Sequence, residues 1–334
     1  MRFLFVPAWL GRNRNRLLLA LTIAAGATGA SMVFAQAVPQ ATSARTPAAV
    51  QADQLFWQTF RTGDYAHIQA SLDASTGAYL RNPNDAVTAA HVGWLHMWRV
   101  SERIRNQQVP PTITDDVVLA RKYFQRAVDL APDDARYRGF LASAILAEAQ
   151  LDRDGTLSAH GAEVMQKSIA DWPAFNLFTA GYVVSRLGPA SDSFKKGLEQ
   201  QWQNMDVCAQ AKVDRHNPDM TNFAKRTTAA TQGNRDARAC LNSSIAPHNE
   251  EGFFLNMGDM LVKSGDWKTA QKIYAGARLS PDYAQWPYRD VLEQRIRDAR
   301  ANVAAFNAPE QPGTRPATPI MLTSAYACMA CHQR

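Results

Sequence analysis

Long apolar runs, blocks of one charge and cysteine are all scarce in this sequence of 334 residues. Outside one uncharged run, Leu17 to Ala35, no stretch is long enough to suggest a membrane span. Lysine and arginine form no block and no aromatic stacking platform accompanies them, which excludes an obvious nucleic-acid partner. Runs of β-branched residues are short, which favours helices over strands. Only four cysteines occur, and they fall into two pairs.

The single long apolar run has the form of an export signal. Arginines between positions 12 and 16 precede it, and small residues stand before cleavage sites after Ala35 and after Ala37. We expect residues 1–35 to be removed and the mature protein to be periplasmic, with no stable membrane span. The alternative is an uncleaved anchor, because the run is nearly long enough to cross a bilayer.

Removal of this signal changes the charge of the protein. The formal net charge of the whole chain is +6, and residues 1–35 contain four arginines and no acid, so the mature chain carries +2. The basic isoelectric point therefore gives no support to a nucleic-acid partner. Roughly 300 residues remain, enough for a sizeable core or an array of repeats.

Most of the mature chain has a helical pattern. Residues 36–51 are small and polar and are expected to be a disordered leader. From about residue 52 to 306, apolar residues recur at spacings of three and four. Short turns such as Asn-Pro-Asn-Asp at 82–85, Pro-Asp-Asp at 132–134 and Gly-Asp at 265–266 should end one helix and cap the next.

Two segments contain a repeated pair of helices. In the clearer one, small and large residues alternate at helical spacing: Phe254, Met257-Gly258, Leu261, Gly265-Asp266-Trp267, Ala270, Tyr274, Ala277 and Pro281. In the other, Val92-Gly93 precedes Ala120, Phe124, Ala127 and Pro132. Small residues let two antiparallel helices approach closely, and large ones fill the gaps between pairs. Gly181 suggests a further small-residue crossing.

These patterns resemble the tetratricopeptide repeat. The resemblance implies an all-α, helical-repeat solenoid over residues 52–307 whose surface binds a protein client or redox partner. An irregular helical bundle is the alternative. The last helix is expected to start at Trp286-Pro287, with a polar outer face (Arg289, Glu293, Arg297 and Arg300) typical of a capping helix.

The first pair of cysteines, Cys208 and Cys240, encloses a segment with few large apolar residues. In an exported protein this pair is expected to form a disulfide that closes residues 208–240. A metal site is the alternative, because His216 and His248 follow the two cysteines at the same eight-residue offset. Zinc sites use more closely spaced ligands, so the disulfide is favoured.

The second pair of cysteines lies at the end of the chain. Residues 308–319 contain four prolines and form a Pro-rich linker that can reach up to about 37 Å. Residues 320–334 then form a predicted helix that ends in Cys328-Met-Ala-Cys331-His332. Cys-x-x-Cys-His resembles the haem-attachment motif of c-type cytochromes. A redox dithiol or half of a zinc site is the alternative, but no strand precedes the motif and no second ligand pair matches it.

The resemblance implies one covalent haem c, bound through Cys328 and Cys331, with His332 as an axial ligand of the iron. The opposite ligand is open, because Met321 and Met329 share the helix of His332 and only two residues follow it. The conceivable ligands upstream are His67, His91, His96, His216, His248, Met97, Met205 and Met260. Residues 91–98 are the richest cluster, although a role in the helical core is favoured, because His96 stands where the repeat normally packs an aromatic and Trp94 and Trp98 resemble core residues.

Three functions are compatible with these features. The first is an exported mono-haem cytochrome-like protein for electron transfer, whose repeats dock a redox partner. The second is a non-enzymatic adaptor that binds proteins through its repeats, for example in cytochrome assembly. The third is a haem sensor with an open distal site. No catalytic residues are predicted, since no motif for peroxidase chemistry accompanies the haem motif.

Overall fold

The computed structural model describes residues 45–61, 64–101, 111–185, 187–223, 235–241, 250–280, 283–286 and 288–309. These ranges contain α-helices and short 3-10 turns and no strand, so the described protein is all-α. They all belong to the unit that begins at Ala44. The expected signal peptide, most of the Pro-rich linker, and Cys328, Cys331 and His332 lie outside the described residues.

The α-helices of the described residues are α1 (Pro47–Arg61), α2 (Ile68–Arg81), α3 (Ala86–Ser101), α4 (Ile113–Leu130), α5 (Ala135–Asp152), α6 (Gly155–Asp171), α7 (Pro173–Tyr182), α8 (Asp192–Ala209), α10 (Arg235–Leu241), α11 (Glu250–Ser264), α12 (Trp267–Gly276) and α13 (Arg289–Asn307). Three 3-10 turns accompany them: η1 (Tyr65–His67), η3 (Ala277–Leu279) and η4 (Tyr283–Gln285).

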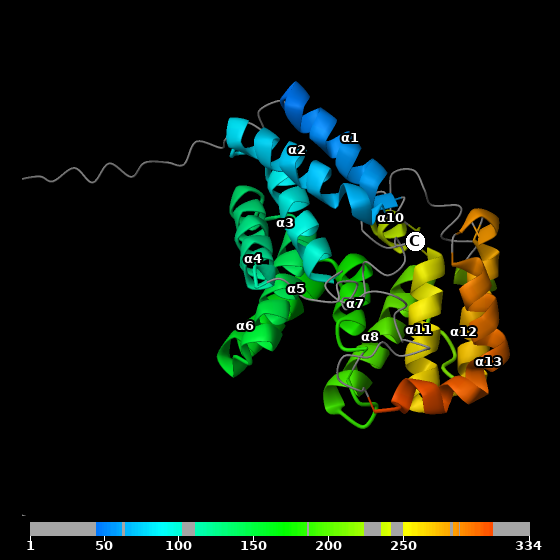
Figure 1. Cartoon of the computed structure of the whole chain (residues 1–334). Coiled ribbons are helices and arrows are strands. Elements are labelled where there is room, and N and C mark those ends of the chain that lie inside the picture. Colours follow the sequence, from blue (N-terminus) through cyan, green and yellow to red (C-terminus); the bar gives the residue numbers. More distant parts are fainter. Residues whose placement is uncertain are drawn as a thin grey trace, which may run out of the picture. The chain divides into compact units, whose positions relative to one another are not determined.

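Helices pack mainly against their neighbours in sequence (Figure 1). The closest pairs include α3 with α4, α5 with α6, α7 with α8, and α11 with α12. First helices of successive pairs also touch, as α5 touches α7 and α11 touches α13. This arrangement confirms the predicted all-α class and is consistent with a helical-repeat fold, in which each unit buries its apolar face against the next.

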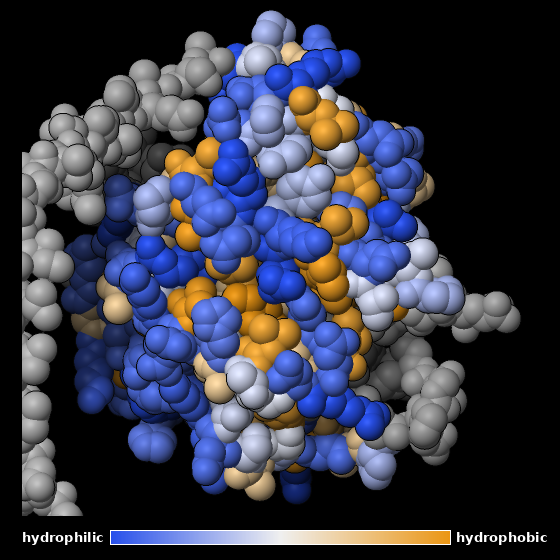
Figure 2. All heavy atoms as spheres, turned by 90° about the vertical axis from the view of Figure 1, so that its left-hand side faces the viewer, coloured by the Kyte–Doolittle hydropathy of each residue, from blue (hydrophilic) through white to orange (hydrophobic). Residues whose placement is uncertain are grey.

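Apolar side chains collect between the helices, as amphipathic packing requires. One continuous buried cluster runs from Phe56 in α1 to Phe306 in α13. Figure 2 views the side of Figure 1 on which α4 and α6 lie. On that face hydrophobic side chains lie mostly in the middle, and hydrophilic ones surround them.

The predicted turn residues cap the helices that follow them. Asp134 accepts from the backbone N–H of Arg136 before α5, and Asp266 accepts from Thr269 N–H at 3.2 Å in α12. Asp85 accepts from two N–H groups at the start of α3. Gly265 has a φ of 96°, a conformation that glycine adopts without a Cβ clash. Each cap satisfies backbone donors that the first helical turn leaves unpaired.

Glycines mark the points where paired helices come closest. A Cβ at Gly93 would lie 2.8 Å from the Phe124 ring, so α3 meets α4 through this residue. A Cβ at Gly258 would overlap the ring of Tyr274, which joins α11 to α12. The predicted crossing at Gly181 is present as well, and Gly181 faces Gly197 of α8. The tight crossings explain why small residues recur at these positions.

The beginning of α1 corrects the expected boundary of the leader. The helix starts at Pro47, inside residues 36–51 that were expected to be disordered. Thr46 Oγ1 accepts from the N–H of Ala49 at 3.1 Å, and proline is well tolerated in a first turn. Ala49 also packs in a small cluster with Ala78 of α2. A cap and a tertiary contact thus order residues whose composition alone suggested a leader.

The last helix differs from the prediction at both its start and its inner face. It begins at Arg289 and not at Trp286. Its outer arginines are exposed as expected, but Arg295 is buried at 6% exposure, with Nε 3.2 Å from Oδ1 of Asp259. The hydroxyl of Tyr274 donates to the same carboxylate at 2.6 Å. The Arg295–Asp259 ion pair and the hydrogen bond from Tyr274 therefore join α11, α12 and α13. A buried carboxylate needs such partners to offset the loss of its hydration.

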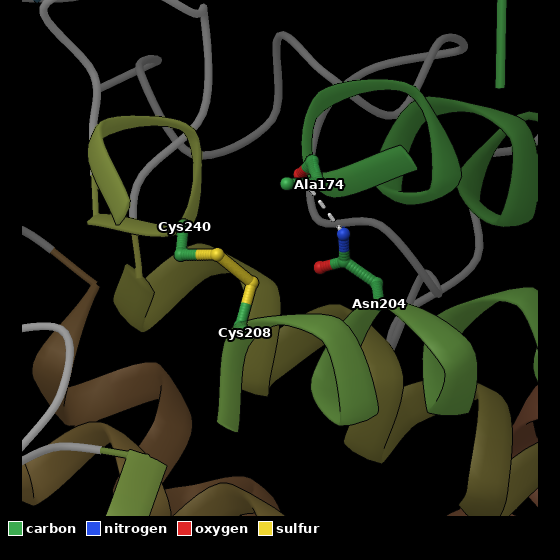
Figure 3. Close-up of a disulfide and its surroundings, with 4 residues drawn as sticks. All are labelled: Ala174, Asn204, Cys208 and Cys240. Carbon is green, nitrogen blue, oxygen red and sulfur yellow. Dashed lines mark hydrogen bonds between the residues drawn. A yellow bond between two sulfur atoms is a disulfide. The ribbon is translucent and has the colours of Figure 1, made fainter. Parts of the chain in front are cut away.

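A disulfide joins Cys208 of α8 to Cys240 of α10, with Cα atoms 5.7 Å apart (Figure 3). One turn earlier in α8, the side-chain amide of Asn204 donates to the carbonyl of Ala174 in α7 at 3.1 Å. The predicted disulfide is present, and the metal alternative is wrong because both thiols are consumed; His248 lies outside the described residues.

The segment between these cysteines is better packed than its composition suggested. Phe223 is 2% exposed, and its ring lies 5.3 Å from that of Phe254 in α11. Met220 is also buried and reaches Gly276 of α12. The few large apolar side chains of residues 210–223 are therefore packed against α11 and α12.

The Gly258 crossing can be tested by adding one methyl group. Gly258→Ala should lower the free energy of unfolding by about 1–3 kcal/mol, because the new Cβ overlaps the Tyr274 ring in a packed core. Gly155→Ala is the matched control, since nothing lies within 4 Å of its Cβ position at the start of α6. Urea unfolding measures both. Equal stability of the two variants would contradict the close approach.

Removal of the disulfide gives a second test. The chain-entropy model for a separation of 32 residues predicts that Cys208→Ala/Cys240→Ala loses about 3–4 kcal/mol of unfolding free energy. The wild-type protein in excess reductant should unfold at the same urea concentration as this variant. An unchanged unfolding midpoint after either treatment would show that α10 is held without the covalent link.

Candidate functional site

Helix α3 carries the cluster predicted from residues 91–98, and each of these residues is buried. Trp94 of α3 and Phe140 of α5 lie edge to face, with ring centroids 4.6 Å apart. Both rings border two separate cavities. His91 lines one cavity and Met97 lines the other, so two of the predicted iron ligands reach a space that could admit another group.

The first cavity, which we call the His91 cavity, has a volume of about 200 Å³. Its wall combines aromatic and charged side chains from α1, α3 and α5 with Arg45, which lies two residues before α1. They are Arg45, Asp53, Phe56, Trp57, His91, Trp94, Arg136, Tyr137 and Phe140. A mixed wall of this kind is typical of a binding site, in which aromatic faces give area and a few charges give orientation.

His91 is held from two sides in this cavity. Its ring stacks on that of Phe56, with centroids 3.9 Å apart and planes 9° apart. Its Nδ1 lies 3.0 Å from Oδ1 of Asp53, and the guanidinium of Arg45 lies 3.5 Å from the same oxygen. Arg45 in turn donates to Asp85 at 3.0 Å. The imidazole orientation is therefore determined by α1 and by the residues that precede α1 and α3.

The protonation states of His91 and Asp53 follow from their burial and from their contacts with each other. Burial lowers the pKa of His91, although the Asp53 carboxylate acts in the opposite direction. Burial by itself raises the pKa of Asp53, but His91 and Arg45 bring that pKa below its usual value. A neutral imidazole next to an ionised carboxylate has its proton on Nδ1 and a lone pair on Nε2. Carboxylate-oriented imidazoles of this type are common as metal ligands.

The charged side chains on the far wall are also paired. Arg136 makes a bidentate interaction with Asp134, with bonds of 2.9 Å and 2.6 Å. Burial and the Asp134 carboxylate raise the pKa of Tyr137 to about 12, so its hydroxyl is neutral. Among the described residues that line this cavity, no serine, threonine, cysteine or lysine is present for His91 to activate. The aromatic and charged wall of this cavity is suited to binding a ligand.

The second cavity, which we call the Met97 groove, has a volume of about 290 Å³ and a mainly apolar wall. Met97 comes from α3, Phe140 and Leu146 from α5, and Val183, Val184 and Leu187 from the turn between α7 and α8. Leu187 is 41% exposed, so the groove opens to solvent beside it. A soft thioether thus lies in an apolar setting, in contrast to the charged His91 cavity.

The remaining predicted ligands lie in other surroundings. The Nδ1 of His96 lies 2.8 Å from Asp116 Oδ1, and its ring stacks on Tyr123. This imidazole occupies the inside of the α3–α4 pair, as the core interpretation predicted. His67 and His216 are exposed, Met205 and Met260 are fully buried, and His248 lies outside the described residues.

The partners of His91 were not found from the sequence. Arg45 lies within residues 36–51, which composition assigned to a disordered leader, and Asp53 follows just after them. Arg136, on another wall of the cavity, follows a turn that was predicted only as a helix cap. They meet because α1, α3 and α5 converge, which residue spacing does not encode. The Thr46-Pro47 helix start was the one local signal that could have placed Arg45 near structure.

Within the described residues, no three His, Cys, Asp or Glu side chains come together as a metal site. No helix in this part of the chain is long and apolar enough to cross a membrane. No protein-family model matches the chain, and no curated protein sequence matches it.

The burial of His91 predicts a pH dependence. Its folded pKa is below the unfolded value of about 6.5, so the unfolded chain binds the extra proton and stability falls as pH drops below about 6.5. One proton accounts for at most about 1.4 kcal/mol per pH unit. His91→Gln should lose less unfolding free energy between pH 7 and pH 5 than the wild type.

Urea unfolding at several pH values measures this slope. His160→Gln removes an exposed histidine of α6 and should keep the wild-type slope. The same slope for wild type and His91→Gln would contradict a neutral, buried His91.

Proposed function

We propose that this chain is an exported helical-repeat protein that carries one covalent haem c and transfers electrons. Cys328 and Cys331 would hold the porphyrin through thioether bonds, and His332 would be an axial ligand of the iron. The observation that carries the proposal is the motif Cys328-Met-Ala-Cys331-His332 in a chain whose residues 1–35 have the pattern of an export signal.

The Cys208–Cys240 disulfide supports the proposed compartment. Disulfides persist where proteins are oxidised, in the periplasm and outside the cell, and are rare in the cytosol. Covalent haem is likewise attached outside the cytoplasm. The two cysteine pairs would then have separate roles, one closing a loop of the scaffold and one holding the cofactor.

A single covalent haem supplies one-electron chemistry when it is bound. The role of the helical repeats would be to dock the redox partner, while the Pro-rich linker holds the haem nearby at an effective concentration of order millimolar. Of the described candidates for the opposite iron ligand, His91 and Met97 line cavities. A methionine would raise the reduction potential and a second histidine would lower it.

The proposal predicts a covalent haem that depends on two cysteines. Periplasmic expression with a cytochrome c maturation system should give a Soret band that survives acid–acetone extraction, and haem should stay with the protein on a denaturing gel. Cys328→Ser/Cys331→Ser should lose all covalent haem. Met329→Leu, inside the motif but not a ligand, should keep it. A wild-type protein without covalent haem would end the proposal.

The same preparation tests the other two functions. An intact mass equal to that of a chain beginning at Gln36 or Val38 would agree with signal cleavage. If Cys331→Ser abolishes covalent haem but keeps partner binding and phenotype, the adaptor function is favoured. A five-coordinate high-spin spectrum would favour a sensor with an open distal site, and a six-coordinate low-spin spectrum would favour electron transfer.

A further inference from the structure

The structure ends close to one wall of the Met97 groove. Asn307 is the last residue of α13, and its side-chain amide donates to the carbonyl of Lys263 at 2.9 Å. The ammonium of Lys263 donates to the carbonyl of Ser185 at 3.3 Å. Ser185 follows Val184 and is two residues before Leu187, both of which line the groove. Two hydrogen bonds therefore connect the end of α13 to the groove wall.

Figure 1 shows the same neighbourhood, with the red end of α13 beside the green turn that leads into α8. The amide of Asn307 also donates to Val303 within α13, so the last turn of this helix is held in place. Lys263 is 7% exposed, and its ammonium lies over the ring of Phe194. The point from which residues 310–334 continue is thus anchored against the turn between α7 and α8.

We propose that the Met97 groove is the docking site for the C-terminal segment of this same chain, residues 320–334. This segment contains Ile320, Met321, Leu322 and Tyr326, large apolar side chains that need a partner surface. A cavity of about 150 Å³ holds a benzene-sized group, so about 290 Å³ accommodates two such side chains. Docking uses these side chains and not the haem, so the inference goes beyond the proposed function.

The length of the linker and the difference in charge between the two cavities both favour this occupant. The linker over residues 308–319 can span up to about 37 Å, and it continues from a helix end that hydrogen bonds connect to the groove wall. Tethering gives an effective concentration of order millimolar, so even a millimolar intrinsic dissociation constant fills about half of the sites. The His91 cavity is a poorer site for an apolar segment, because Arg45, Asp53 and Arg136 line it.

Leu187 allows a test that leaves the core intact. Leu187→Glu adds a charge at the open edge of the groove, where the side chain is 41% exposed. Leu279→Glu is the matched control, because Leu279 is a leucine of similar exposure, 45%, that does not line the groove. Circular dichroism checks that both variants keep the helical content of the wild type.

The experiment uses full-length exported protein with a photo-cross-linking phenylalanine in place of Tyr326. Illumination should give cross-links within one chain to residues of the groove, such as Leu146 or Val183, identified by peptide mass spectrometry. A tenfold weaker docking constant, about 1.4 kcal/mol, would lower the occupancy from about half to about a tenth, so Leu187→Glu should reduce the cross-link yield at least about fivefold. Leu279→Glu should leave the yield unchanged.

Three results would overturn the proposal. Cross-links that fall on other helices, or yields that do not respond to Leu187→Glu, would place the segment elsewhere. Cross-links that appear only in a dimer-sized band and vanish on dilution would assign the groove to a second copy of the chain.

Haem attachment separates this proposal from the proposed function. The cross-linking is repeated in the Cys328→Ser/Cys331→Ser background. Groove cross-links without covalent haem would support docking even if the wild-type protein proves to carry no haem. Covalent haem without groove cross-links would leave the proposed function standing and end the docking proposal.

Discussion

The close approach of paired helices is the constraint on which the rest of the structure depends. Where Gly93 meets Phe124 and Gly258 meets Tyr274, the absence of a Cβ lets one helix lie directly against an aromatic ring of the next. Packed interiors tolerate little added volume, so these contacts determine how far apart the helices stand. The spacing of α3, α4 and α5 then decides where space is left, and both cavities border the Trp94–Phe140 contact between α3 and α5.

Several charged side chains are buried in the described part of this scaffold, and two networks show how such charges are paired. Asp259 is fully buried, and Arg295 and Tyr274 compensate it across three helices. In the His91 cavity, Arg45 and Asp53 hold an imidazole that burial keeps neutral. Unpaired charges would be costly in such surroundings, so these groups are connected in networks. The networks join elements that are distant in sequence and give the helical stack contacts that simple repeats lack.

The proposed haem-attachment motif and the proposed docking surface differ in what specifies them. The proposed haem-attachment motif and export signal are local patterns that a few residues define. The proposed docking surface depends on where helices meet, and we assign it the C-terminal segment because the end of α13 is anchored beside the α7–α8 turn. A tail that docks on its own scaffold would limit the positions from which a redox partner could approach the haem.

Local sequence patterns predicted the helices, the caps at Asp134 and Asp266, the small-residue crossings and the Cys208–Cys240 pair. These features depend on periodicity, on turn chemistry and on the small number of cysteines, which can be seen in short stretches or in rare residues. The packing of distant helices, in contrast, places Arg45 and Asp53 around His91, buries Arg295 and opens an apolar groove at Met97. Such contacts bring together helices far apart in the chain, and no local pattern specifies which faces will meet.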